Sequence, residues 1–147
     1  LSSVLFEGLI FQCGEQHWAV YLAQVESCLP FAYHSARPGN SNTGLFDWQG
    51  EAIPYLDLAA FQGRSGRSES GSIIVLRDGN RRTGVLTDRI VGMGRLVLTP
   101  SDVVLRKAKF IAGTALLPDA NIGLVMDAVE LARALSVVAD PSKEGAA

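Results

Sequence analysis

The sequence is poor in the residues that usually provide covalent cross-links, metal ligands or catalysis. Its 147 residues include two cysteines and two histidines, too few for the disulfide frameworks of small secreted domains. Cys13 and Cys28 do not form a Cys-x-x-Cys pair, so we expect both to be buried, as small hydrophobic side chains in a reducing cytoplasm. With His17 and His34 they fit no common zinc-finger spacing, and we expect no metal site.

The chain also lacks a long apolar run and a strong net charge. No run approaches the roughly 18–20 residues that cross a bilayer, so we expect no direct membrane insertion. The first residues have no basic region, cleavage site or Met, which predicts a processed or truncated chain without a signal peptide. A net charge of −2 gives no electrostatic reason to expect nucleic acid as a partner. The one basic cluster, at Arg77, Arg81, Arg82 and Arg89, surrounds a predicted hairpin without interleaved aromatic residues, which favours a solvated hairpin.

Glycine is plentiful, and together with proline it divides the sequence into short apolar runs. This spacing is typical of short strands and turns, and it predicts an all-β protein. Asp78-Gly79-Asn80 is the strongest hairpin signal, since Asp-Gly favours the tight turn between two antiparallel strands. We expect strands at 9–11, 18–22, 52–56, 72–77, 83–87, 94–98, 109–117 and 122–126, and loops at 34–44 and 62–71.

Three residues mark irregular or helical structure. Pro54 predicts an edge or irregular strand, because proline has no N–H for a sheet hydrogen bond, and Asp57 is expected to cap a single helical turn. Near the C-terminal end, Asp127-Ala-Val-Glu130 fits a capping box, in which Glu130 reaches back to the backbone N–H of Asp127. A short helix should follow, with one apolar face formed by Ala128, Leu131, Ala132 and Leu135.

No arrangement of catalytic residues is evident. There is no Gly-x-Ser-x-Gly elbow and no Gly-x-x-x-x-Gly-Lys phosphate loop, and Gly92-Met93-Gly94 is interpreted as a strand bend rather than as half of a dinucleotide-binding motif. Asp47, Asp57, Asp88 and Asp127 lie at predicted strand ends or turns, where capping roles explain them. We therefore expect neither an enzyme nor a cofactor. A hydrolase stays an alternative, since the members of a Ser–His–Asp triad need not be neighbours in sequence.

The order of these segments resembles the CheW family over nearly the whole chain. The most diagnostic part is GLFDWQGEAIPYLDL at 44–58, which is similar to a family stretch where Gly-x-x-Asn-x-Arg-Gly leads into Ile-x-Pro-x-x-Asp-Leu. The segment GVLTDRI at 84–90 is similar to the family's Gly-hydrophobic-x-Val-Asp. Residues 11–26 resemble the family's first hairpin with its Val-x-Glu-Ile step, and residues 111–127 resemble its last hairpin.

This resemblance implies two intertwined five-stranded Src-homology-3-like barrels around a shared core, with a short C-terminal helix. We expect one such domain over residues 1–137 and a disordered tail over 138–147. Members of the family couple chemoreceptors to a CheA-type histidine kinase, without catalysis or cofactor. The resemblance therefore implies two partners, the kinase's CheW-like regulatory domain and the cytoplasmic tip of a chemoreceptor, in the cytoplasm at membrane-associated receptor arrays.

Residues linked to partner binding in the family correspond to Val25, Ser27, Gly44, Gln49 and Met93 of this sequence. Each also has a structural interpretation. Val25 and Met93 fit a hydrophobic core equally well, and Gly44 fits a position chosen for its backbone geometry alone.

The sequence departs from the family pattern at three of its positions. Gln49 stands where the family has Arg, Asp47 where it has Asn, and Ser27 where it often has Glu. Glutamine supplies neither the charge nor the donor fork of arginine, and the joint loss of both charges leaves neither unpaired. We interpret the chain as a divergent member with altered partner specificity. Two alternatives stay open, the C-terminal regulatory domain of the kinase itself and an unrelated peptide-binding β-barrel.

Overall fold

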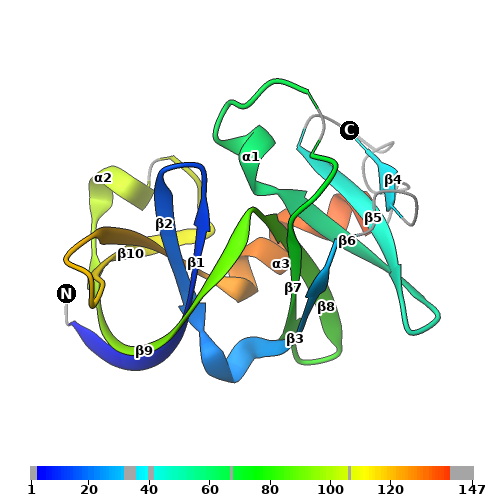
Figure 1. Cartoon of the computed structure of the whole chain (residues 1–147). Helices are drawn as coiled ribbons and strands as arrows, with labels where there is room; N and C mark the ends of the chain where they lie inside the picture. The colour runs from blue at the N-terminus through cyan, green and yellow to red at the C-terminus, as the bar shows by residue number, and fades with distance from the viewer. Residues whose placement is uncertain (1–2, 32–35, 40–41, 67, 106, 140–147) are drawn as a thin grey trace.

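The computed structural model confirms the predicted all-β class, with two sheets and a C-terminal helix (Figure 1). The two sheets lie side by side, and the helix α3 (Ala128–Ala139) runs behind them. The predicted tail at 138–147 overlaps the end of this helix, and from 140 onward it lies outside the described residues, as does His34. The structure describes residues 3–31, 36–39, 42–66, 68–105 and 107–139.

Five strands close into a barrel that takes its strands from both ends of the chain. β1 pairs antiparallel with β2 and β9, and β11 pairs parallel with β2. The seam between β9 and β10 is short, with only Gly113 and Thr114 opposite Pro100 and Thr99. The barrel order is β1-β2-β11-β10-β9, with β1 at Val4–Cys13, β2 at Gln16–Tyr21, β9 at Arg89–Pro100, β10 at Ile111–Leu116 and β11 at Ile122–Met126.

The intervening segment forms a second sheet of six strands in the order β3-β7-β8-β6-β5-β4. The predicted hairpin at Asp78-Gly79-Asn80 is confirmed, and Gly79 has the positive φ of 62° that its tight turn requires. A sixth strand is present because Ala36–Pro38 pairs with β5, although residues 34–44 were predicted as a loop. The strands are β3 (Val25–Pro30), β4 (Ala36–Pro38), β5 (Thr43–Trp48), β6 (Glu51–Asp57), β7 (Ser72–Asp78) and β8 (Arg81–Thr87).

A shared hydrophobic core joins the barrel, the second sheet and α3. Trp18 and Phe11 from the barrel meet Ile74 from the second sheet and Leu131 from α3 in one buried cluster. The barrel and the second sheet each enclose a smaller cluster of their own. The four apolar positions predicted for α3 are all buried, so both sheets depend on the same helix for part of their core.

The caps of the helices follow the sequence prediction in part. Asp57 accepts a hydrogen bond from the Ala60 backbone and begins the single turn α1 (Leu58–Phe61). Asp127 caps α3 as predicted, but the reciprocal bond from Glu130 is absent, because the Asp127 N–H donates to the carbonyl of Phe110 instead. The remaining short elements are η1 (Leu22–Gln24) and α2 (Asp102–Leu105).

Two further predictions were wrong. Cys13 is buried as expected, but Cys28 is exposed, because it alternates outward on β3, an edge strand of the second sheet. Pro54, predicted on an edge or irregular strand, is buried within an internal strand. The sheet tolerates this proline because β6 pairs with β8 only from Tyr55 onward, which leaves Pro54 facing the β5 side alone.

Candidate functional site

The five residues implied by the family resemblance lie on different parts of the molecule. Val25 and Ser27 belong to β3, Gly44 to β5, and Gln49 to the turn between β5 and β6. Met93 alone lies in the barrel, on β9. The structure therefore brings four of the five to the second sheet.

Two of these residues are held inside the fold. Gly44 is buried, and a Cβ atom added there would lie 2.7 Å from the ring carbon Cε1 of Tyr55. Glycine is therefore required for the close approach of this ring to the backbone. Val25 packs against the shared core and is half-buried. For both residues the contacts favour a packing role, and a role in partner binding stays a prediction.

Gln49 is exposed at the tip of the β5–β6 hairpin. Trp48 and Glu51 face each other across the strands, so Gln49 and Gly50 are the two central turn residues. Their φ angles are 50° and 79°, the combination that defines a type I′ turn. Glycine suits this turn, whereas a glutamine in the left-handed region is strained. The Gln49 side chain is thus presented to solvent from a constrained backbone.

Arg82 on β8 connects this turn to the edge of the sheet. Its Nε–H donates to Glu26 Oε1 at 2.8 Å, and its Nη1 lies 3.8 Å from Glu51 Oε1. The guanidinium carbon also lies 5.6 Å from the centre of the Trp48 ring, within the range of a cation–π interaction. We call the group formed by Glu26, Trp48, Gln49, Glu51 and Arg82 the Gln49 surface.

A β-bulge on β3 positions Glu26, one of the two acidic residues of this group. Val25 pairs with Leu76 and Ser27 with Val75, so Glu26 is the extra residue between them. Bulges redirect side chains, and here Glu26 reaches Arg82. The hydrogen bond from Arg82 holds the pKa of Glu26 below its usual range.

This role of Arg82 differs from the solvated basic cluster predicted from the sequence. The only available signal was the position of Arg82 beside the hairpin tip, and nothing in the sequence indicated Glu26 as its partner, because 56 residues separate them. Arg89, assigned to the same cluster, instead donates to Gln12 Oε1 in the barrel. Asp47, expected at a strand end or turn, is the penultimate residue of β5 and pairs with Arg37 at 3.0 Å.

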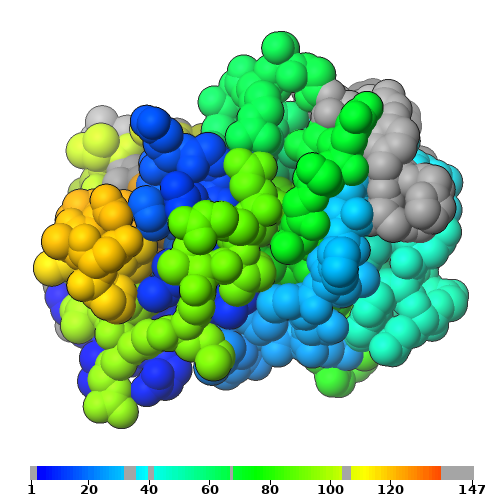
Figure 2. All heavy atoms as spheres, viewed as in Figure 1, coloured from blue at the N-terminus to red at the C-terminus, as the bar shows by residue number. Residues whose placement is uncertain are grey.

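Met93 belongs to an apolar area on the outer face of the barrel. Its side chain is 68% exposed, and Leu5 on the neighbouring strand is 63% exposed. Leu5 lies opposite Val97 in the β1–β9 register, while Glu7 lies opposite Arg95 and pairs with it at 3.1 Å. Figure 2 shows β9 uncovered on the front of the molecule. We call the exposed group Leu5, Val91, Met93 and Val97, with the Glu7–Arg95 pair, the Met93 surface.

Asp88 links the barrel to the second sheet at the point where the chain passes from β8 to β9. Its Oδ2 accepts the backbone N–H of Gly14, in the turn between β1 and β2, at 2.7 Å. Both terminal nitrogens of Arg64, which follows α1, donate to the same carboxylate at 2.9 and 3.1 Å. The bond from Arg64 holds the pKa of Asp88 below its usual range. The barrel and the second sheet are therefore joined by polar contacts as well as by the shared core.

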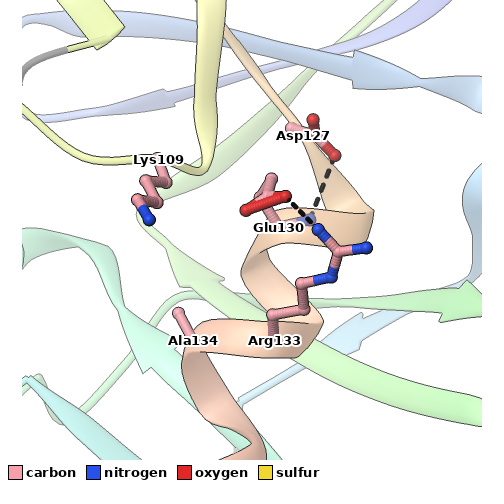
Figure 3. Close-up of a pocket in the computed structure, with 5 residues that line it drawn as sticks. All are labelled: Lys109, Asp127, Glu130, Arg133 and Ala134. Carbon is pink, nitrogen blue, oxygen red and sulfur yellow. Dashed lines mark hydrogen bonds and ion pairs between the residues drawn. The ribbon is translucent and has the colours of Figure 1, made fainter.

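A pocket of about 650 Å³ lies beside the first turn of α3 (Figure 3). Its acidic side chains already have partners. Asp127 accepts hydrogen bonds from the backbone of the helix, and Glu130 accepts one from Arg133 at 2.6 Å. Lys109 lies on the opposite wall of the pocket, from a different segment. These contacts give both carboxylates a structural role at the start of α3, since Asp127 caps the helix and Glu130 pairs with Arg133.

The part of the chain that the structure describes shows neither a metal-binding cluster nor a membrane-spanning helix. No group of three or more His, Cys, Asp or Glu side chains is placed to hold a metal ion in that part of the chain. None of its helices is long and apolar enough to cross a bilayer.

Comparison with known proteins identifies the fold and the family. The scaffolding protein TtCheW from Thermoanaerobacter tengcongensis is similar in structure, with a TM-score of 0.68 and 16% sequence identity over 84% of this chain and 89% of that one. This likeness concerns the arrangement of the two sheets. A family model described as the CheW-like domain matches residues 7–136, which is most of the chain. The protein therefore belongs to the CheW-like domain family.

Proposed function

We propose that this protein is a non-catalytic adaptor that couples chemoreceptors to a CheA-type histidine kinase. It would act in the cytoplasm, at membrane-associated receptor arrays. Its partners would be the CheW-like regulatory domain of the kinase and the cytoplasmic tip of a receptor. The family membership supports this class of function, and the two exposed surfaces support it physically.

The observation that carries the proposal is the presence of two chemically different surfaces on one small domain. The Met93 surface is apolar apart from one ion pair, and exposed apolar patches commonly mark protein–protein contacts. The Gln49 surface is polar and contains a tryptophan, a residue type that is enriched at binding hot spots. An adaptor needs two such areas, because it must hold two partners at once.

The specificity of the Gln49 surface should differ from that of relatives with arginine at this position. A neutral Gln49 offers a partner hydrogen bonds but no charge. The nearby positive charge of Arg82 is already paired with Glu26. We propose that a partner meets this surface with uncharged hydrogen-bonding groups, which would be the divergent specificity expected from the sequence.

Titration of the intact protein with each partner tests the proposal. The purified regulatory domain of the CheA-type kinase from the same organism and a receptor-tip fragment should each bind with a measurable Kd in isothermal titration calorimetry. Absence of binding to both, with all proteins folded, would overturn the coupling function.

Three variants distinguish the surfaces. Gln49→Ala and Met93→Ser should each weaken one partner by about tenfold or more, as hot-spot truncations do. Glu69→Gln, an exposed change in the 62–71 loop, is the matched control and should leave both affinities unchanged. Equal effects of the control and the two test variants would assign binding to another part of the molecule.

A further inference from the structure

The β5–β6 hairpin has little backbone support near its tip. β6 pairs with β8 only over Tyr55–Asp57, while the turn is at Gln49 and Gly50, several residues away. Figure 1 shows the tip of this hairpin projecting from the sheet. On its other side the hairpin pairs with β4 only as far as Phe46. Beyond Phe46, the backbone pairing that remains is that between β5 and β6 themselves. Isolated two-stranded ribbons of this kind are marginally stable in water.

Arg82 supplies side-chain contacts where this backbone pairing is missing. It touches both residues that flank the turn, Trp48 through its ring and Glu51 through its carboxylate. Its third contact, Glu26, lies on β3 at the edge of the sheet. One guanidinium thus connects the turn to β8 and to β3. A planar guanidinium can stack on a ring and donate in its plane at the same time, which the ammonium of lysine does less well.

The strain at Gln49 makes such support necessary. A residue with a side chain is disfavoured at a φ of 50°, and Asn and Gly are the usual residues of this turn. Without external contacts, the segment should sample other conformations. Trp48 and Glu51 set the direction of both strands as they enter the turn, so holding them limits the backbone angles open to Gln49.

We propose that Arg82 is a positioning residue for partner binding, because it holds the β5–β6 turn so that Gln49 is presented in one left-handed conformation. This inference rests on the proposed function, in which Gln49 belongs to a partner surface. Arg82 acts through the turn rather than by touching the partner. Its effect should therefore disappear when the turn is held by other means.

A double-mutant cycle tests this mechanism directly. Arg82→Ala should lower the affinity for the partner that binds the Gln49 surface by about tenfold. Gln49→Asn keeps the carboxamide and creates the Asn-Gly pair that favours a type I′ turn. In the Gln49→Asn background, Arg82→Ala should lower the affinity by less than about threefold. An equal loss in both backgrounds, or no loss in either, would overturn the positioning role.

Arg81→Ala is the matched control. Arg81 neighbours Arg82 on the same hairpin and pairs with Asp78 at 3.0 Å, away from the Gln49 turn. This variant should bind as tightly as the wild type. If it weakened binding as much as Arg82→Ala, a general loss of positive charge would explain the effect and the proposal would fail.

The conformation of the turn can also be followed without any partner. A left-handed residue gives a strong intraresidue NOE between its amide and α protons, and Arg82→Ala should weaken this signal at Gln49 while Arg81→Ala leaves it intact. An unchanged signal in Arg82→Ala would overturn the inference whatever the binding data show. If Arg82→Ala loses the signal but the wild-type protein binds neither partner, the proposed function is overturned, and with it the binding role of Arg82. The conclusion that Arg82 holds the turn would still stand.

Discussion

The barrel and the second sheet differ in how their strands are held by neighbouring structure. In the barrel, every strand has a neighbour on each side, so backbone pairing alone closes the structure. The second sheet has two edges, at β3 and β4, and its β5–β6 hairpin extends beyond its pairing with β8. In that hairpin, the side-chain contacts of residues such as Arg82 take the place of the backbone pairing that neighbouring strands provide in the barrel. The turn that carries Gln49 therefore depends on side-chain contacts for its support.

The exposed surfaces follow the same division. On the barrel, the Met93 surface lies on β1 and β9, which pair with each other beneath it, and its one ion pair joins directly opposite residues, Glu7 and Arg95. On the second sheet, the Arg82–Glu26 pair spans three strands, and a bulge is needed to bring Glu26 into place. Changes to the barrel surface should therefore act locally, whereas changes to the second sheet should move a turn.

The largest expected effect comes from the core that joins the two sheets. Trp18 is fully buried in this core, so Trp18→Ala should lower the free energy of unfolding by about 3–5 kcal/mol. Trp48 then becomes the only tryptophan, and its fluorescence reports the second sheet. In urea titrations, this fluorescence and the far-UV circular dichroism should change together. Separate transitions would show that the sheets unfold independently and that the core does not couple them.

The short barrel seam should be the next most sensitive feature. A Cβ atom at Gly113 would lie 2.3 Å from the backbone oxygen of Thr99, and a backbone atom cannot move aside as a flexible side chain can. Gly113→Ala should lower the free energy of unfolding by about 2 kcal/mol. Gly92→Ala is the control, because nothing lies within 4 Å of its added Cβ, and its effect should stay within about 0.5 kcal/mol. Similar losses in both variants would mean that closure of the barrel does not depend on this contact.

Local patterns in the sequence predicted most of the fold. The Asp78-Gly79 turn, the cap at Asp127 and the apolar face of α3 depend on residues close together in the chain, and all are present. The errors concern contacts that no local pattern contains. Pro54 was predicted on an edge or irregular strand because the register of β6 on β8 was unknown, and Cys28 was predicted in the core because the position of β3 at an edge was unknown.

The candidate site was predictable only as a set of positions. The family resemblance indicated Gln49 and Met93, and the structure places both at the surface. The family resemblance could not indicate Arg82, since the cation–π contact and the pair with Glu26 join β8 to two distant segments. Long-range side-chain contacts of this kind depend on strand order and on a bulge, neither of which is encoded in neighbouring residues.

A smaller effect is expected at the polar link between the two sheets. Because Arg64 holds the pKa of Asp88 below its usual range, this contact stabilises the fold above the unfolded pKa of aspartate and is lost as the pH falls through the folded pKa. Arg64→Gln should therefore be less stable than the wild type at pH 6, by no more than about 1 kcal/mol since both side chains are partly exposed. The difference should shrink as the pH falls below about 4.

Urea titrations at several pH values measure this dependence. Arg95→Gln serves as the control, because the Glu7–Arg95 pair lies within the barrel face and is more exposed. It should change stability little at any pH. A constant difference between Arg64→Gln and the wild type from pH 6 to pH 3 would mean that the charge of Asp88 does not contribute to the link.

The two thiols give the smallest expected change in stability and the most direct test of the contrast between core and edge. Cys28→Ser should change the free energy of unfolding by less than about 0.5 kcal/mol, because the residue is exposed.

The reactivity of the two thiols should differ as well. Burial raises the pKa of the Cys13 thiol to about 11, and it also makes the thiol inaccessible to reagents. Maleimide at neutral pH should therefore label one thiol in the folded wild type, as counted by mass spectrometry. Desolvation raises the pKa of the Cys28 thiol too, so labelling should be slower than for free cysteine. Folded Cys28→Ser should remain unlabelled until urea exposes Cys13. Rapid labelling of folded Cys28→Ser would show that the core around β1 opens without global unfolding, and the barrel would then be no more rigid than the sheet beside it.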